Sequence, residues 1–172
     1  MPALKGQNPL DFQSLSAERT FGRLLIVQSM SEISDAIQDK CLAFSDRIIK
    51  LNDYLLEQAA SIPPDPSSIN HHPSRVPVHL QSVATLANQL LRSGPSVGAN
   101  NAEATSAISK ADFKSKSYIA LKEARESLYW IDLLHRNNYL DDKQFGSIYA
   151  DCEELVKILT HRCKKLDEEA GK

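Results

Sequence analysis

Apolar residues recur at steps of three and four along most of the chain, which is the spacing of one helix face. The first clear stripe begins at Ile37 and ends at Leu55. Ser34 or Asp35 stands where an N-cap is expected. Residues 59–77 hold five of the eight prolines, a density that no helix tolerates and that predicts a long loop.

A second helix is predicted from about residue 78 into the run RSGPSVGANNAEA at 92–104. The small residues of that run lie four apart and form a smooth groove on one helix face: Gly94, Gly98 and Ala102. Gly94 and Pro95 predict a kink or an interruption. A phosphate-binding loop does not fit, because no strand precedes the run and no phosphate-loop glycine spacing is present. The run therefore predicts close helix packing.

The third helix is predicted to start at Ser109, with Asp112 as its capping pair. It ends where Asn137 or Asn138 can adopt the left-handed conformation. Its apolar face includes Phe113 and the following residues at helical spacing: Ser117, Ala120, Leu121, Ala124, Leu128, Ile131 and Leu134.

The fourth helix carries a complete start signal. Asp141 is the predicted N-cap, Gln144 closes a capping box, and Leu140 with Phe145 forms a hydrophobic staple. Four amphipathic helices with mostly short connections predict an all-α, antiparallel up-down four-helix bundle over residues 35–168.

The two ends of the chain lie outside this pattern. Residues 1–34 form an N-terminal extension, for which two interpretations remain open: a short helix that docks on the body or on a partner, or a loose tail. Residues 169–172 form a solvated tail. The chain has 172 residues, of which 42 % are hydrophobic, and a net charge of −2. The hydrophobic fraction suffices for a core, and the net charge excludes nucleic-acid or membrane binding by bulk charge alone.

The three cysteines favour a reducing compartment with buried thiols. Cys152 and Cys163 are eleven residues apart on one predicted helix, roughly 16 Å, which is too far for a disulfide. There is neither a signal sequence nor an apolar run long enough to span a membrane. We therefore expect a soluble cytoplasmic protein without a membrane partner.

Basic and aromatic residues alternate on the third helix, in a stripe about 120° from the core face. It contains Lys114, Tyr118, Lys122, Arg125 and Tyr129, and Arg136 continues it. Such a stripe suits phosphate contact with base stacking, or a seam between subunits. We favour the seam for Tyr118, Arg125 and Tyr129. The candidate nucleic-acid-binding residues are Arg92, Lys110, Lys114, Lys116, Lys122 and Arg136.

Residues next to the stripe have structural interpretations. Trp130 is predicted to anchor packing in the bundle or at an interface. Glu126 can pair with Lys122 one turn away. The sequence contains no metal site, cofactor site or catalytic set that we recognise, because His71 and His72 have no cysteine or carboxylate at ligand spacing. His161 and Cys163 lie two apart on a helix and point away from each other. We expect a protein that is not an enzyme.

Four motifs carry a resemblance to a known family. They read RSGxSVGAN at 92–100, SKADF at 109–113, ALKEARESLYW at 120–130 and YADCEELVKILT at 149–160. The sequence resembles the bacterial four helix bundle protein family. This family includes proteins encoded in intervening sequences of ribosomal RNA genes and the accessory variability determinant of diversity-generating retroelements.

The resemblance implies a homopentameric barrel of antiparallel four-helix bundles without enzymatic activity. The retroelement members bind nucleic acid and associate with a reverse transcriptase during mutagenic retrohoming. We expect the same partners here, with RNA and DNA both open. A structural or protein-interaction scaffold that binds no nucleic acid is the alternative. Pro95 and Asn101 depart from the family pattern, and so does the long loop.

Overall fold

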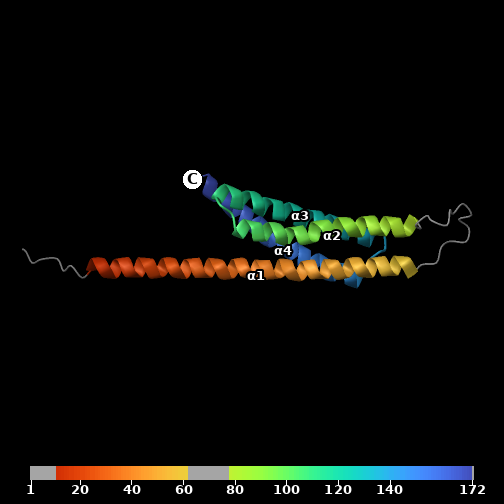
Figure 1. The fold of residues 1–172 in the computed structure, drawn as a ribbon, viewed down its shortest axis with the longest axis horizontal. Helices are drawn as coiled ribbons and strands as arrows, with labels where there is room; N and C mark the ends of the chain where they lie inside the picture. Colours follow the sequence, from red (N-terminus) through yellow and green to blue (C-terminus); the bar gives the residue numbers. More distant parts are fainter. Residues whose placement is uncertain (1–10, 62–77, 172) are drawn as a thin grey trace, which may run out of the picture. The chain divides into compact units, whose positions relative to one another are not determined.

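Four α-helices make up the described part of this computed structural model, which covers residues 11–61 and 78–171, with side chains described from 33 to 61 and from 80 onward. The helices are α1 (Asp11–Ser61), α2 (Val78–Thr105), α3 (Lys110–Arg136) and α4 (Asp142–Ala170) (Figure 1). Within these ranges no residue is in a strand. The predicted all-α four-helix bundle is confirmed.

The chain divides into two units, Met1–Ala36 and Ile37–Lys172, and the division falls inside α1. The cap predicted at Ser34 or Asp35 is wrong, because α1 already begins at Asp11. Between Asp11 and Ser61 the chain has no proline and one glycine, so nothing in its backbone chemistry stops the helix earlier. Of residues 1–34, those from Asp11 onward form the first part of the 51-residue α1, and therefore neither a separate short helix nor a loose tail; residues 1–10 lie outside the described part.

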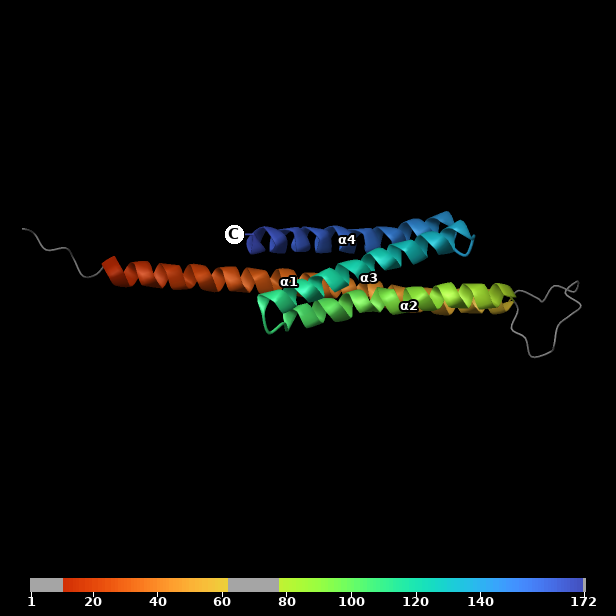
Figure 2. The same cartoon turned by 90° about the horizontal axis from the view of Figure 1, so that it is seen from above.

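In the second unit, short turns join α2 to α3 and α3 to α4, and the two helices on either side of each turn run in opposite directions (Figure 2). The α2–α3 turn spans residues 106–109 and the α3–α4 turn spans 137–141. The helix α3 packs on both α2 and α4. The helix α1 closes the bundle through contacts with α2 and α4. The predicted loop at 59–77 begins later than expected, because α1 continues to Ser61 and Ala59 is buried; residues 62–77 lie outside the described part.

The core is one contiguous cluster to which all four helices contribute at the predicted helical spacing. Its large side chains with almost no exposure include Phe44, Ile48, Val83, Leu90, Val97, Ile131, Leu134, Leu155 and Leu159. Ala120 and Ala124 of α3 are also fully buried. Small residues at these positions allow the neighbouring helices to approach α3 closely.

The predicted ends of α3 and the predicted start of α4 are confirmed in detail. Ser109 caps α3 and accepts from the Asp112 amide, and Asp141 forms the capping box of α4 with Gln144. At the end of α3, Asn138 has a φ of 60°. The Asn138 and Tyr139 amides donate back to carbonyls in the last turn of α3, which is a Schellman motif. These local signals turn the chain sharply between α3 and α4.

Candidate functional site

The glycines of the run at 92–104 lie against α1 of the same chain. A Cβ atom on Gly94 would stand 2.9 Å from Ile48 Cγ1, and one on Gly98 would stand 3.2 Å from Cys41 Cβ. Ala102 does not share this contact, because it is exposed. Of the kink or interruption predicted at Gly94 and Pro95, the interruption is wrong, because α2 continues through Pro95 to Thr105.

A buried amide joins three helices near the same glycines, and sequence reasoning missed it. Asn101 of α2 has no exposed surface. Its Nδ2 donates to Gln38 Oε1 of α1 at 2.6 Å, and its Oδ1 accepts from Arg162 Nη1 of α4 at 2.7 Å. The Arg162 guanidinium lies over the Phe113 ring, 5.7 Å from its centroid. Burial lowers the pKa of Arg162, so Asn101 supplies a necessary neutral acceptor for a partly buried charge.

Two of the predicted phosphate-contacting lysines are already neutralised. Lys114 Nζ lies 2.8 Å from Asp167 Oδ1, and Lys116 forms an ion pair with Glu103. The Glu103 hydrogen bond is the main cause of the raised pKa of Lys116. Both lysines are thus paired with carboxylates of the same chain, which makes them weaker candidates for phosphate contact.

Tyr118 shares the carboxylate that binds Lys114. Its hydroxyl donates to Asp167 Oδ2 at 2.5 Å. This hydrogen bond stabilises the neutral phenol and raises the pKa of Tyr118 to about 12. Asp167 in turn has a lowered pKa, because Lys114 and Tyr118 both donate to its charged form. Tyr118 is therefore held in place, with 38 % of its surface exposed.

The other four predicted cations are exposed and make no ion pair within the described residues: Arg92, Lys110, Lys122 and Arg136. Arg92 and Lys122 both act electrostatically on Glu123, whose pKa is nevertheless raised, chiefly by burial. Because both cations act on Glu123, Arg92 of α2 and Lys122 of α3 lie in one region of the surface.

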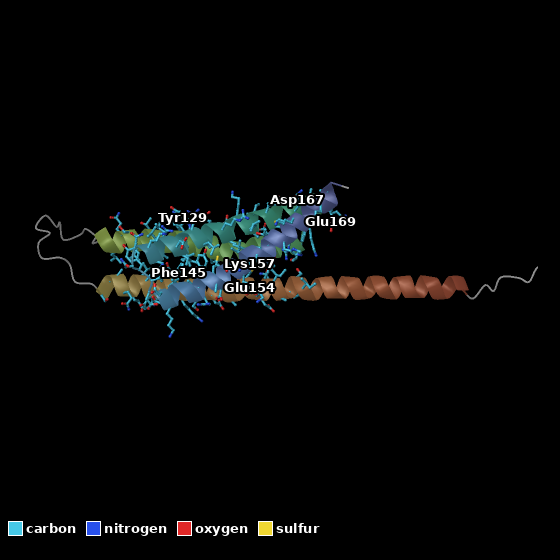
Figure 3. All side chains as sticks on the ribbon, turned by 180° about the vertical axis from the view of Figure 1, so that it is seen from behind. Tyr129, Phe145, Glu154, Lys157, Asp167 and Glu169 are labelled. Carbon is cyan, nitrogen blue, oxygen red and sulfur yellow. The ribbon has the colours of Figure 1, made fainter. Side chains whose placement is uncertain are left out.

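An aromatic pair, one ring of which is exposed, stands in the last third of α3. Tyr129 is 58 % exposed, and Figure 3 shows it on α3, with Asp167 on α4. Its ring meets the half-buried Trp130 ring edge-on, at 4.9 Å between centroids. The Trp130 indole N–H donates to Glu126 Oε1 at 3.1 Å. The expected pairing of Glu126 with Lys122 is therefore wrong, because the indole takes the carboxylate.

Ion pairs that the sequence did not reveal connect α1 to α4. Arg47 pairs with Asp151 and also donates to Ser147 Oγ at 2.8 Å. Lys40 Nζ lies 3.0 Å from Glu154 Oε1. All four charged groups are roughly half exposed, so each pair contributes no more than about 1 kcal/mol. They set the register of α1 against α4.

The comparisons with known proteins agree with the motifs. The family described as 23S rRNA-intervening sequence protein matches residues 77–161. A crystal structure of a protein of unknown function from the S23 ribosomal protein family of Bacteroides thetaiotaomicron is 35 % identical, with a TM-score of 0.61, and the alignment covers 76 % of this chain and 97 % of that one. The chain belongs to the 23S rRNA-intervening sequence protein family. No functionally curated protein matches it.

The match places the family region of this intervening-sequence protein on α2, α3 and most of α4. All six candidate cations lie within that region, as do Tyr118, Arg125, Tyr129 and Trp130. The family resemblance predicted from the motifs is confirmed. The first unit, Met1–Ala36, lies outside the matched region.

The thiols of this intervening-sequence protein are not poised for chemistry. All three cysteines are free and buried. Burial raises the pKa of Cys41 to about 11 and that of Cys152 to about 12, so neither forms a thiolate near neutral pH. Among the described residues, no group of His, Cys, Asp or Glu can hold a metal ion, while His71 and His72 lie outside them. No helix in the described part is long and apolar enough to cross a membrane.

Proposed function

We propose that this intervening-sequence protein is a non-enzymatic, homo-oligomeric accessory protein that binds nucleic acid through exposed cations of α2 and α3. One observation carries the proposal: four of the six candidate cations, Arg92, Lys110, Lys122 and Arg136, are exposed and unpaired within the described residues. An unpaired surface cation releases counterions when it contacts a phosphate, whereas a paired one must first give up its carboxylate. In an oligomer each copy contributes the same four cations, so that the assembly can bind one nucleic acid at several points.

The aromatic pair favours nucleic acid with unpaired bases over a regular duplex. Tyr129 exposes most of its ring surface and is supported from the side by Trp130. Bases that are already unstacked can lie on such a ring, and the gain does not depend on base identity. We therefore expect single-stranded DNA or looped RNA to bind more tightly than duplex DNA.

A binding series tests this function. The protein is titrated against fluorescent structured RNA, single-stranded DNA and duplex DNA, with fluorescence anisotropy as the readout, from 50 to 300 mM salt. The doubly substituted variant Arg92→Glu/Lys110→Glu is compared with Lys50→Glu/Lys143→Glu, which changes net charge equally at exposed lysines outside the cluster. We expect the first variant alone to bind at least ~10-fold more weakly, with a shallower salt dependence. Absence of binding by the wild type at 50 mM salt, or equal loss in both variants, would refute the proposal.

The protein partner proposed from the family resemblance is a reverse transcriptase, and the proposed assembly is a homopentamer. Light scattering on the purified chain measures the assembly directly. Co-purification with a retroelement reverse transcriptase, in the presence and absence of nuclease, tests the partner. Loss of the complex after nuclease treatment would show that nucleic acid bridges the two proteins.

A scaffold that binds other proteins and no nucleic acid is the second candidate function. The net charge of −2 favours it, and so do the acidic partners of Lys114 and Lys116. In that case, removal of residues 1–34 abolishes partner capture while light scattering still reports the intact oligomer. Capture that survives the deletion counts against the extension as the binding element.

A further inference from the structure

The outward side of α1 carries an apolar stripe that no described residue covers. Leu42 is 55 % exposed and Ile49 is 46 % exposed, and Leu56 follows at the same interval of seven with intermediate burial. Exposed aliphatic side chains are ordinary when scattered, but Leu42, Ile49 and the half-buried Leu56 stand in one line at an interval of seven, which indicates a helix-packing seam.

Acidic residues fill the alternate positions of this seam. Asp39, Asp46 and Asp53 are exposed and lie seven apart. Together with the three aliphatic residues they give steps of three and four, which is the spacing of a heptad seam in which one position is apolar and the other is acidic. None of the three forms an ion pair within the described residues. Here "α1 seam" denotes Asp39, Leu42, Asp46, Ile49, Asp53 and Leu56.

A second seam of the opposite charge runs along α3. Its steps of four and three connect Tyr118, Lys122, Arg125, Tyr129, Asp132 and Arg136. The three cations among them are exposed and make no ion pair with the described residues. The two tyrosines are 38 % and 58 % exposed. This set is the "α3 seam".

The two seams match in length, charge and chemistry. The α1 seam spans 18 residues and the α3 seam 19, so their first and last residues are about 26 and 27 Å apart along the helix axis. The α1 seam carries three carboxylates, and the α3 seam carries three cations and one carboxylate, Asp132, so the two seams have opposite net charge. Tyrosine rings supply broad, stiff apolar surface for the leucine and isoleucine side chains, and tyrosine and arginine are enriched at protein interfaces.

We propose that the α1 seam of one copy docks on the α3 seam of a second copy. Pairing of two α1 seams would set aspartate against aspartate, and pairing of two α3 seams would set cation against cation, so like-with-like contacts are unfavourable. A contact between different surfaces leaves one seam of each kind free, and it therefore continues to a third copy until a ring closes. This inference rests on the proposed homo-oligomer and identifies its contact. The contact takes up Lys122, Arg136 and Tyr129, so this contact and base stacking on Tyr129 are alternatives for that ring. Arg92 and Lys110, which lie outside the seams, remain the phosphate contacts.

Charge reversal and exchange test the docking. We compare the full-length chain with Asp39→Lys/Asp46→Lys in the α1 seam, Lys122→Glu/Arg125→Glu in the α3 seam, and the variant that combines all four changes. Glu168→Lys/Glu169→Lys at the exposed end of α4 is the control for altered charge. Circular dichroism verifies that each variant is folded, and sedimentation velocity at 1–100 μM measures assembly.

We expect each seam variant to raise the dissociation constant of assembly at least ~10-fold, the control to assemble like the wild type, and the combined variant to recover assembly. A wild type that is monomeric at 100 μM would overturn the oligomer in the proposed function together with this contact. An oligomer that withstands either seam variant, or a combined variant that stays dissociated, would overturn the contact alone. Nucleic-acid binding is read separately from Arg92→Glu/Lys110→Glu, so its failure is not confused with either result.

Discussion

Gly94 is the position where one added methyl group should be least tolerated. A Cβ atom there would stand 2.9 Å from Ile48 Cγ1 and 3.2 Å from Ile48 Cγ2. Ile48 has no exposed surface, and its branched side chain has one strongly preferred rotamer in a helix. In Gly94→Ala, either α1 moves away from α2 or Ile48 leaves its rotamer. Either response costs packing energy.

Two opposing effects set the size of the change. Alanine is better than glycine inside a helix by about 1 kcal/mol, whereas an extra methylene forced into a packed core costs about 1–3 kcal/mol. We expect Gly94→Ala to lower the free energy of unfolding by about 1 kcal/mol. Gly146→Ala in α4 is the matched control, because nothing lies within 4 Å of its added Cβ. It should raise the free energy of unfolding by about 1 kcal/mol.

Urea unfolding followed by far-ultraviolet circular dichroism, at one fixed protein concentration, measures both variants. The midpoints should move in opposite directions with unchanged slopes, and the melting temperatures should differ by several degrees. In an Ile48→Ala background, which removes the two Cγ contacts, Gly94→Ala should become neutral or stabilising. If Gly94→Ala stabilises the wild-type background as much as Gly146→Ala does, the close contact between α1 and α2 is refuted.

Three further predictions concern the titratable and buried polar groups. The three buried thiols should resist Ellman's reagent at pH 8 in the native protein and react fully in denaturant. Unfolded thiols ionise near pH 9.0, whereas burial raises the pKa of Cys152 to about 12. The free energy of unfolding should therefore fall as pH rises above 9.0. Ultraviolet titration should show the pKa of Tyr118 raised to about 12, and Asp167→Asn should lower that pKa. Asn101→Leu removes the acceptor of Arg162 and should lower the free energy of unfolding by about 1–3 kcal/mol in urea denaturation; an unchanged midpoint would show that the buried amide is dispensable.

Local signals made the helix ends of the bundle predictable. The Ser109 cap, the capping box at Asp141 and the left-handed turn at Asn138 each depend on residues within a few positions of one another. Such contacts form in any context that permits the turn. The start of α1 was not predictable in this way, because an apolar stripe reports which face is buried and not where the helix begins.

The candidate site was only partly predictable, because the residue that packs opposite a cation decides whether that cation is paired with a carboxylate. The sequence places Lys114 and Lys122 on one stripe, but only the fold brings Asp167 of α4 against Lys114. Glu126 is four residues from Lys122, yet it binds the Trp130 indole. The unpaired cations could be separated from the paired ones only after the helices were assembled.

The sequence by itself determined the all-α class, the order of the helices from α2 onward, the caps of α3 and the start of α4, and most residues of the core, because helical periodicity and capping are properties of neighbouring residues. The tertiary structure decided the rest: the close approach of Gly94 to Ile48, the buried bridge of Asn101 between Gln38 and Arg162, and the surfaces left for partners. These contacts join residues more than forty positions apart, and their partners depend on how each helix is rotated and shifted against the next. That rotation and shift are set by packing the whole core at once.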